Sequence, residues 1–436
     1  MSNKPDGPSV VENRKAITFG LKVYKQILKA MPNHTNLLIP PFVLYKGLGL
    51  LNLVVPDSDS KEELAAVLGA KRNQQDTAKV FWRMICKYLK RGGNKRPIFL
   101  ARLFIDKKFE LKKDTKELMK TYFRISRKAI DIADASSIAN TFNQWAKRKS
   151  GNAITKVAEP SQIDTNQEMF LVCITTFKAR WQYQFYKPST ANVNFQVNDT
   201  QVVKVPMMFL SKKKLRYGVL GDLQFFNLYF KDDEHAMFFI LPKNLQAFRD
   251  VESKIETFDI IGLRRSMTIY DMSVAIPKFR IEMQFPLSEY VRKAGLNLTF
   301  SPRSKFTEFT PRPTNLQQGF LSAVIDVQEG GLATDGYGWE SGDTNPTVTL
   351  NRPFFYAVMS AKHRVFLWGC VSNPSTKSRT TVKDIIENPE VFQRQPADIK
   401  CECSRSARTK KRSKCSKRKV QRKNSSDSNT EPQEDS

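Results

Sequence analysis

The sequence feature that most constrains the fold is a sharp change of composition near Pro374. Residues 375–436 contain 16 Lys and Arg, many polar residues and almost no aromatic side chain. Between Arg405 and Lys423, eleven of nineteen residues are basic and none is acidic. Such a block cannot bury enough apolar surface to offset the entropy lost on ordering. We therefore expect one folded domain over residues 1–374 and a disordered Lys/Arg-rich tail over residues 375–436.

The remaining chain is apolar enough to fold but not to span a membrane. Phe alone contributes 30 of the 436 residues, which excludes global disorder. The longest apolar stretch, 36–55, is interrupted by Pro40, Pro41, Lys46 and Asn52, so no membrane helix is expected. The first residues lack the apolar core of a signal peptide. This favours a cytoplasmic or nuclear location, with an extracellular location as the alternative.

Hydrophobic periodicity predicts helices mostly early and strands mostly late. Apolar residues at helical spacing predict one helix over 12–31 and another over 80–89. Apolar runs rich in β-branched and aromatic residues predict strands over 170–177, 223–230, 236–241, 348–358 and 363–371. This order of elements is typical of a large α+β domain.

Motifs for catalysis or metal binding are missing from the sequence. The three histidines are His34, His235 and His363, and none has the spacing of a zinc site. The tail thiols Cys401, Cys403 and Cys415 have no nearby histidine to complete a closed zinc site. No nucleophile elbow or phosphate-binding loop is present. We therefore expect no enzymatic activity, no cofactor and no metal.

A series of short strings resembles the serpin family of serine protease inhibitors. The string Phe177-Lys-Ala-Arg-Trp181, followed by Phe185, is similar to the family's Phe-Lys-Gly-x-Trp…Phe. The other strings stand in family order along the chain: 36–41, 143–145 with Gly151 and Ile154, 205–208, 276–279, Gly295 with 300–301, 329–330, 351–354 and 369–374. The resemblance implies three β-sheets, about nine helices and an exposed reactive-centre loop, here near residues 330–350.

The same resemblance implies a mechanism and a partner. A serine (or cysteine) protease would attack the loop and form an acyl-enzyme. The cut loop would then insert as a new central strand of the largest sheet and distort the bound protease. Counting forward from Gly330 puts the reactive bond at Thr344–Asn345. The chain would act as a monomer.

The hinge of this loop departs from the family pattern. Family inhibitors carry a small hydroxyl residue and a run of alanines after the hinge glycine, whereas the thirteen residues 330–342 contain five glycines in all and bulky aromatic residues. We expect alternate residues from Gly331 to face the buried side of the sheet, which would bury an Asp335 carboxylate at a cost of several kcal/mol. The hinge residues in this interpretation are Glu329, Gly330, Gly331, Ala333 and Asp335. The chain is thus a nominal inhibitor whose hinge chemistry opposes trapping.

The polar cluster with which inhibitory serpins hold the gap in the sheet is also replaced. By alignment, we expect its positions to hold Pro40, Val43, Cys173 and Phe320. An apolar seam needs no exchange of hydrogen bonds and would keep the sheet shut.

Two basic regions suggest a second function, the binding of polyanions by a non-inhibitory serpin. Between Arg83 and Lys128 there are 16 basic and 4 acidic residues. In glycosaminoglycan-binding serpins the polyanion lies on the helix at this position, so the resemblance implies binding of nucleic acid or glycosaminoglycan by Arg83, Lys87, Lys90, Arg91, Lys95 and Arg96. The alternative is a solvated helix face.

The tail contains two further basic clusters, which predict a nuclear-import signal or a nonspecific nucleic-acid tether. These clusters are Lys410, Lys411 and Arg412, and Lys417, Arg418 and Lys419. The alternative is a tail that only adds solubility.

Overall fold

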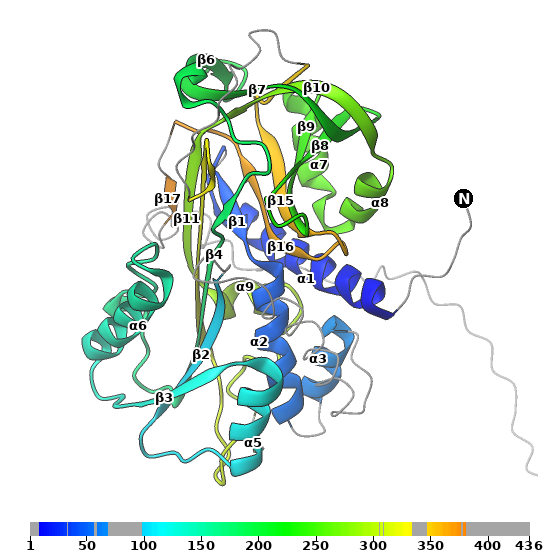
Figure 1. The fold of residues 1–436 in the computed structure, drawn as a ribbon. Coiled ribbons are helices and arrows are strands. Elements are labelled where there is room, and N and C mark those ends of the chain that lie inside the picture. The colour runs from blue at the N-terminus through cyan, green and yellow to red at the C-terminus, as the bar shows by residue number, and fades with distance from the viewer. Residues whose placement is uncertain are drawn as a thin grey trace, which may run out of the picture. The chain divides into compact units, whose positions relative to one another are not determined.

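The computed structural model of the protein describes residues 8–32, 34–55, 59–68, 98–304, 306–307, 309–333, 347–375 and 378–380. These residues form eight α-helices and two β-sheets (Figure 1). The expected α+β class is confirmed. None of the described helices is both long enough and apolar enough to cross a membrane.

The first sheet has nine strands. Its long strand β7 (Val202–Leu220) pairs with β6, β8 and β10, and so joins two groups of strands into one network. The other strands are β1 (Leu37–Ile39), β16 (Val365–Val371), β15 (Phe354–Ser360), β9 (His235–Pro242), β8 (Leu223–Tyr229), β10 (Thr268–Pro277), β14 (Val348–Thr349) and β6 (Ala191–Gln196).

The second sheet has eight strands, and its central pair is parallel. Strand β12 (Gln318–Gln328) lies directly against β4 (Met169–Thr176), with Leu321 opposite Cys173. The neighbours are β11 (Phe279–Pro286), β17 (Ser378–Thr380), β2 (Ile98–Asp106), β3 (Ser126–Ile130), β13 (Gly331–Leu332) and β5 (Ala179–Arg180). Strands β17 and β3 lie at the two ends of the strand order.

Helices cover both faces of the eight-stranded sheet (Figure 1). Helix α6 (Ala135–Ser150) lies on one face; the Asp134 side chain caps its N-terminus, and Gly151 ends it with a φ of 63°. Helix α2 (Pro41–Val54) lies on the other face and packs against β2, β4 and β16, so all fourteen of its residues are buried between the sheets. The remaining helices are α1 (Pro8–Ala30), α3 (Asp59–Leu68), α5 (Lys113–Leu118), α7 (Leu245–Ser253), α8 (Ile260–Arg265) and α9 (Leu287–Lys293).

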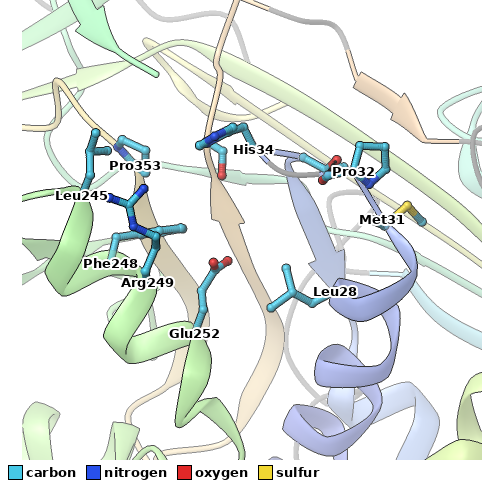
Figure 2. A pocket seen from close by; sticks show the side chains of 11 residues that line it. Leu28, Met31, Pro32, His34, Leu245, Phe248, Arg249, Glu252 and Pro353 are labelled. Carbon is cyan, nitrogen blue, oxygen red and sulfur yellow. Dashed lines mark hydrogen bonds between the residues drawn. The ribbon is translucent and has the colours of Figure 1, made fainter. Parts of the chain in front are cut away.

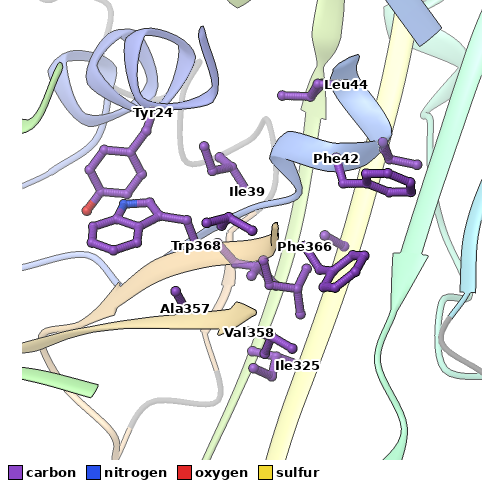
Figure 3. Packing of buried hydrophobic residues seen from close by; sticks show 14 of the residues in the cluster. Tyr24, Ile39, Phe42, Leu44, Ile325, Ala357, Val358, Phe366 and Trp368 are labelled. Carbon is purple, nitrogen blue, oxygen red and sulfur yellow. The ribbon is translucent and has the colours of Figure 1, made fainter. Parts of the chain in front are cut away.

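Aromatic side chains fill the space between the two sheets (Figure 3). Phe366 of β16 lies 5.4 Å from Phe42 of α2 and 5.0 Å from Phe99 of β2, measured between ring centroids. A separate cluster lies beneath α6, where Phe142 and Trp145 contact Phe104. The two clusters occupy opposite faces of the eight-stranded sheet, so alternate residues of its strands belong to different cores.

Most of the predicted elements are present. Strands β4, β8, β9 and β16 match their predicted ranges closely, and α1 begins earlier than predicted. The range predicted as one strand over 348–358 contains two strands, since residues 350–353 separate β14 from β15 and include Pro353. The helix predicted over 80–89 lies outside the described residues.

Two expectations about the architecture need correction. In the described residues the expected three sheets are two hydrogen-bonded networks, because β7 continues from one smaller group of strands into the other. Residues 378–380 were expected to belong to a tail without regular structure, but they form β17 and pair in parallel with β11. The rest of the predicted tail, residues 381–436, lies outside the described residues.

Candidate functional site

The candidate site is the tight turn between β12 and β13, where the predicted hinge begins. Residues Glu329 and Gly330 form the turn, Gln328 pairs with Gly331, and Val327 pairs with Leu332. The Ala333 amide donates to the Asp326 carbonyl at 2.7 Å. On its other side β13 pairs antiparallel with β5, Gly331 opposite Arg180 and Leu332 opposite Ala179. The first two residues after the turn therefore already form a strand between β12 and β5.

A buried ion pair fixes the turn. The Glu329 side chain is 3% exposed and accepts hydrogen bonds from Lys278 Nζ and Thr190 Oγ1, each at 3.0 Å. Burial would raise the pKa of Glu329, but the hydrogen bond from Lys278 and the other bonds to this carboxylate outweigh it and hold the pKa below its ordinary value. Lys278 and Glu329 belong to two of the strings that resemble the serpin family.

A third string, Phe177–Trp181 with Phe185, holds the backbone of the turn. The amides of Trp181 and Phe185 donate to the carbonyls of Gly330 and Glu329 at 2.9 and 3.0 Å. The Trp181 Nε1 atom donates to the Gln328 carbonyl at 2.9 Å. The Trp181 ring stacks on Phe230, with 4.9 Å between the centroids. These bonds leave few polar groups of the turn to be satisfied by water.

The backbone at Gly331 leaves no room for a side chain. Its φ is +144°, and an added Cβ would lie 2.7 Å from the Arg180 Cα and closer still to the Ala179 carbonyl oxygen. Only glycine can therefore take this position while β13 stays paired with β5.

The structure also shows which residue of the hinge is buried. Leu332 is fully buried in the main core, whereas Ala333 is exposed and has a φ of +48°. Ala333 was expected on the buried side of an inserted strand; in this state it lies just beyond the end of β13 and is exposed. The predicted hinge residue Asp335 and the predicted reactive bond Thr344–Asn345 lie outside the described residues.

Below the hinge, the seam between β4 and β12 is closed and mostly apolar. Val43 and Cys173 belong to the core on the α2 side, as does Leu321, which lies opposite Cys173. The placement of Phe320 in this seam is wrong, because Phe320 faces α6 and lies 6.0 Å from the Phe142 ring. The position counted back from Gly330 is off by one residue. Because successive side chains of a strand point to opposite faces, this places the side chain on the wrong face of the sheet.

Sequence reasoning missed a buried lysine under this seam. Lys46 of α2 is 4% exposed, and its ammonium donates to the Phe99 carbonyl at 3.3 Å. Burial lowers the pKa of Lys46 to about 8; the nearby Cys173 opposes this shift and Arg124 adds to it. Burial also raises the pKa of the Cys173 thiol to about 12. The sequence did contain a sign of this buried lysine, since Lys46 is the one lysine inside the apolar stretch 36–55.

Part of the predicted polyanion surface is described. The six residues Arg83, Lys87, Lys90, Arg91, Lys95 and Arg96 lie outside the described residues, as do the tail clusters. Strand β3 is described and follows η1, the π-helical turn over Met119–Phe123, and it exposes Arg127 and Lys128. Lys107 and Lys116, on the segments before β3, are paired with Asp131 and Glu110.

Arg102, on the neighbouring strand β2, adds to the positive charge of β3. Arg102 of β2 donates to the Ser126 hydroxyl at 2.8 Å, and its guanidinium lies 5.1 Å from the Trp145 ring centroid. Burial lowers the pKa of Arg102, and the charge of nearby Arg148 lowers it further. These positive charges are close enough to raise the local potential.

Comparisons with known proteins identify the family. The family model of serpins, described as serine protease inhibitor, matches residues 14–374. Alaserpin of Manduca sexta is 25% identical over 354 residues, which cover 78% of this chain and 88% of that protein.

Solved structures show the same fold. Serpin48 of the insect Tenebrio molitor has a TM-score of 0.75 at 18% identity, covering 84% of this chain and 100% of its own. Native protease nexin-1, solved with heparin, has a TM-score of 0.75 at 22% identity, covering 84% and 100%. With the family model spanning most of the sequence and the buried Glu329–Lys278 pair formed by two of its motifs, the chain belongs to the serpin family.

Proposed function

We propose that the chain inhibits serine-type endopeptidases through the segment between Ala333 and Thr347. The observation that carries the proposal is the position of β13, which lies antiparallel to both β12 and β5 at one end of the parallel β4–β12 pair. An antiparallel strand placed between two parallel neighbours can form hydrogen bonds with both of them. A cut segment that continues from β13 would therefore extend a pairing that has already begun.

The buried position of Leu332 makes such an insertion less costly than the sequence suggested. If alternation continues from Leu332, the inward positions after cleavage are Thr334, Gly336 and Gly338. The charged and bulky side chains of Asp335, Tyr337 and Trp339 would then face the side of α6, where Phe320 and Val324 of β12 are buried. The remaining obstacles are the fit of these side chains beside α6 and the entropy of ordering the glycines, about 0.5–1 kcal/mol for each. We therefore propose slow insertion rather than none.

The C-terminal end of the segment is held in the nine-stranded sheet, as a reactive-centre loop requires. The Ser273 amide donates to the Thr347 hydroxyl at 3.2 Å, and β14 pairs in parallel with β10. We keep Thr344–Asn345 as the proposed reactive bond. Thr is not a strong determinant for trypsin-like or chymotrypsin-like enzymes, so the partner is proposed only as a serine (or cysteine) protease.

Mixing the full-length chain with a panel of serine and cysteine proteases tests this function. We expect at least one serine protease to form a complex that survives SDS, with free cleaved chain in excess because insertion of the glycine-rich segment is slow. The cleaved chain should melt well above the intact chain, since the inserted strand adds a full set of ladder hydrogen bonds.

A substitution in the hinge provides the matched control. Thr334→Asp would bury a carboxylate only if the strand inserted, because Thr334 is the next inward position after Leu332, so it should abolish the complex while cleavage continues. Its own melting temperature shows whether the intact fold survives. Cleavage by every protease of the panel, without any complex or any rise in melting temperature, would contradict the proposal.

A second function, binding of a polyanion, is favoured by the exposed basic strand β3. Arg127 and Lys128 are consecutive exposed residues of an edge strand and project toward its two faces, and Arg102 and Arg148 add charge nearby. We propose that this surface binds sulfate or phosphate polymers, together with the helix predicted over 80–89 and the tail clusters. Native protease nexin-1, which has the same fold and was solved with heparin, supports this proposal.

Replacing both Arg127 and Lys128 with serine tests this surface. If each contacts a phosphate, the plot of log affinity against log salt for duplex DNA should flatten by about 2 units. The control is the double variant Lys204→Ser and Lys214→Ser, which removes the same charge from exposed positions of β7. Equal losses in the two variants would show that only net charge matters and would argue against a defined site.

A further inference from the structure

A cavity of about 300 Å³ lies between α1, α7 and the start of β15, outside the hinge and the basic surface. Its apolar wall comes from Leu28, Met31, Leu245, Phe248 and Pro353, and polar side chains, among them Arg249 and Glu252, line a comparable part. Figure 2 shows Glu252 rising from α7 into the space between α7 and α1, on the side of Leu28. The volume is at the lower end of the range for small-molecule sites, and a mix of apolar walls with a few polar groups, here including the charged Arg249 and Glu252, is typical of them.

The Glu252 carboxylate has no hydrogen-bond donor among the described residues, although two cations lie near it. Lys25 of α1 directs its ammonium at the carbonyls of Glu252 and Ser253, at 2.9 and 3.0 Å, and so neutralises the end of α7 rather than the carboxylate. Arg249, one turn earlier on α7, is paired with Asp199 at 3.4 Å. A partly buried carboxylate that receives no hydrogen bond from the chain is costly to keep ionised.

The titration of Glu252 agrees with this geometry. Burial raises the pKa of Glu252 to about 7, and the charge of Lys25 opposes the shift without cancelling it. The other titratable groups around it are Tyr24 of α1, Cys370 of β16 and His34 at the rim of the cavity.

We propose that this cavity binds a small organic amine, with the apolar body among Leu28, Leu245 and Phe248 and the ammonium against the Glu252 carboxylate. An ammonium would supply the hydrogen-bond donor that the carboxylate does not receive from the chain, since the cation in the cavity wall, Arg249, is paired with Asp199. A neutral or anionic ligand of the same shape would leave Glu252 unpaired.

Binding of 2-(2-naphthyl)ethylamine to the full-length chain, measured by isothermal titration calorimetry, tests the site. This probe remains cationic between pH 6 and pH 8, while Glu252 changes from mostly protonated to mostly ionised. We expect the affinity to rise about tenfold over this range, because only the ionised fraction forms the pair. The matched neutral probe 2-(2-naphthyl)ethanol should bind more weakly than the amine at pH 8 and show no such rise.

Two variants separate the carboxylate from the cavity. Glu252→Gln keeps the shape, so the amine should fall to the affinity of the alcohol while the alcohol is unchanged. Leu28→Trp should fill the space and weaken both probes at least tenfold. The proposal is overturned if the wild-type chain binds neither probe at millimolar concentration, or if the amine has no advantage over the alcohol at pH 8. A pH-independent amine affinity in the wild-type chain, which needs no variant, would overturn it equally.

Discussion

Replacing Gly331 with threonine is expected to detach β13 from the sheet and lower the free energy of unfolding by about 2–4 kcal/mol. Threonine is a small hydroxyl residue of the kind that family inhibitors carry after their hinge glycine, so the variant makes the hinge sequence more similar to the family pattern. In this structure its Cβ would overlap the Ala179 carbonyl and the Arg180 backbone. The strand can escape only by leaving its place, which exposes Leu332 to water. Urea denaturation measures the loss.

Two controls separate steric overlap from backbone strain and from lost burial. Gly295 also has a positive φ, +113°, but a Cβ there would meet no described atom within 4 Å, so Gly295→Thr measures the strain alone. Leu332→Ala measures the loss of the buried side chain without the overlap. Hydrogen exchange at the Leu332 and Ala333 amides should accelerate in Gly331→Thr only. Equal stability of Gly331→Thr and Gly295→Thr, with slow exchange in both, would show that β13 tolerates a side chain.

Replacing Lys46 with methionine is expected to have the opposite effect and stabilise the chain by about 2–3 kcal/mol at pH 7. The folded state holds the ammonium between the two sheets, where it donates one hydrogen bond among the described residues, to the Phe99 carbonyl, and its pKa is about 8 there against 10.5 in the unfolded chain. Methionine has a similar length and no charge to desolvate. Thermal and urea unfolding of both proteins measure the gain.

The pH dependence of this difference provides a second check. The folded-state pKa of Lys46 is depressed, so between pH 8 and 10.5 the unfolded chain binds more protons and wild-type stability rises with pH. The advantage of Lys46→Met should therefore shrink by about 2 kcal/mol between pH 7.5 and 9.5. Lys22→Met, on the exposed face of α1, should change stability by less than about 0.5 kcal/mol at either pH. A constant advantage across this range would mean that Lys46 is not desolvated.

The sequence allowed much of the fold to be predicted but little of the site. Strands such as β4 and β16 were found because a strand buried on both faces reads as a continuous apolar run. The motifs around Trp181 and Lys278 identified the family, since their side chains or backbone groups hold the hinge turn. The order of the motifs along the chain then gave the position of the hinge.

The sequence did not show which side chains of a strand face the core or which strands pair with one another. Phe320 and Leu321 are both apolar, so composition does not say which of them faces Cys173, and the register with β4 decides it. The burial of Leu332 depends on a turn of only two residues, which counting from Gly330 did not reveal. The pairing of β17 with β11 is invisible in the composition of the segment that forms it.

The two borders of the eight-stranded sheet have a consequence for self-association. Unpaired amides and carbonyls along a bordering strand invite a second molecule to add its own strand, and this is a common route to aggregates. Strand β17 occupies part of one border, along β11, while β3 lines the other with Arg127 and Lys128. The chain itself covers part of one border with β17, and the positive charges of β3 repel a second molecule at the other border. In concentrated solution, edge-to-edge pairing between the sheets of neighbouring molecules should therefore be disfavoured.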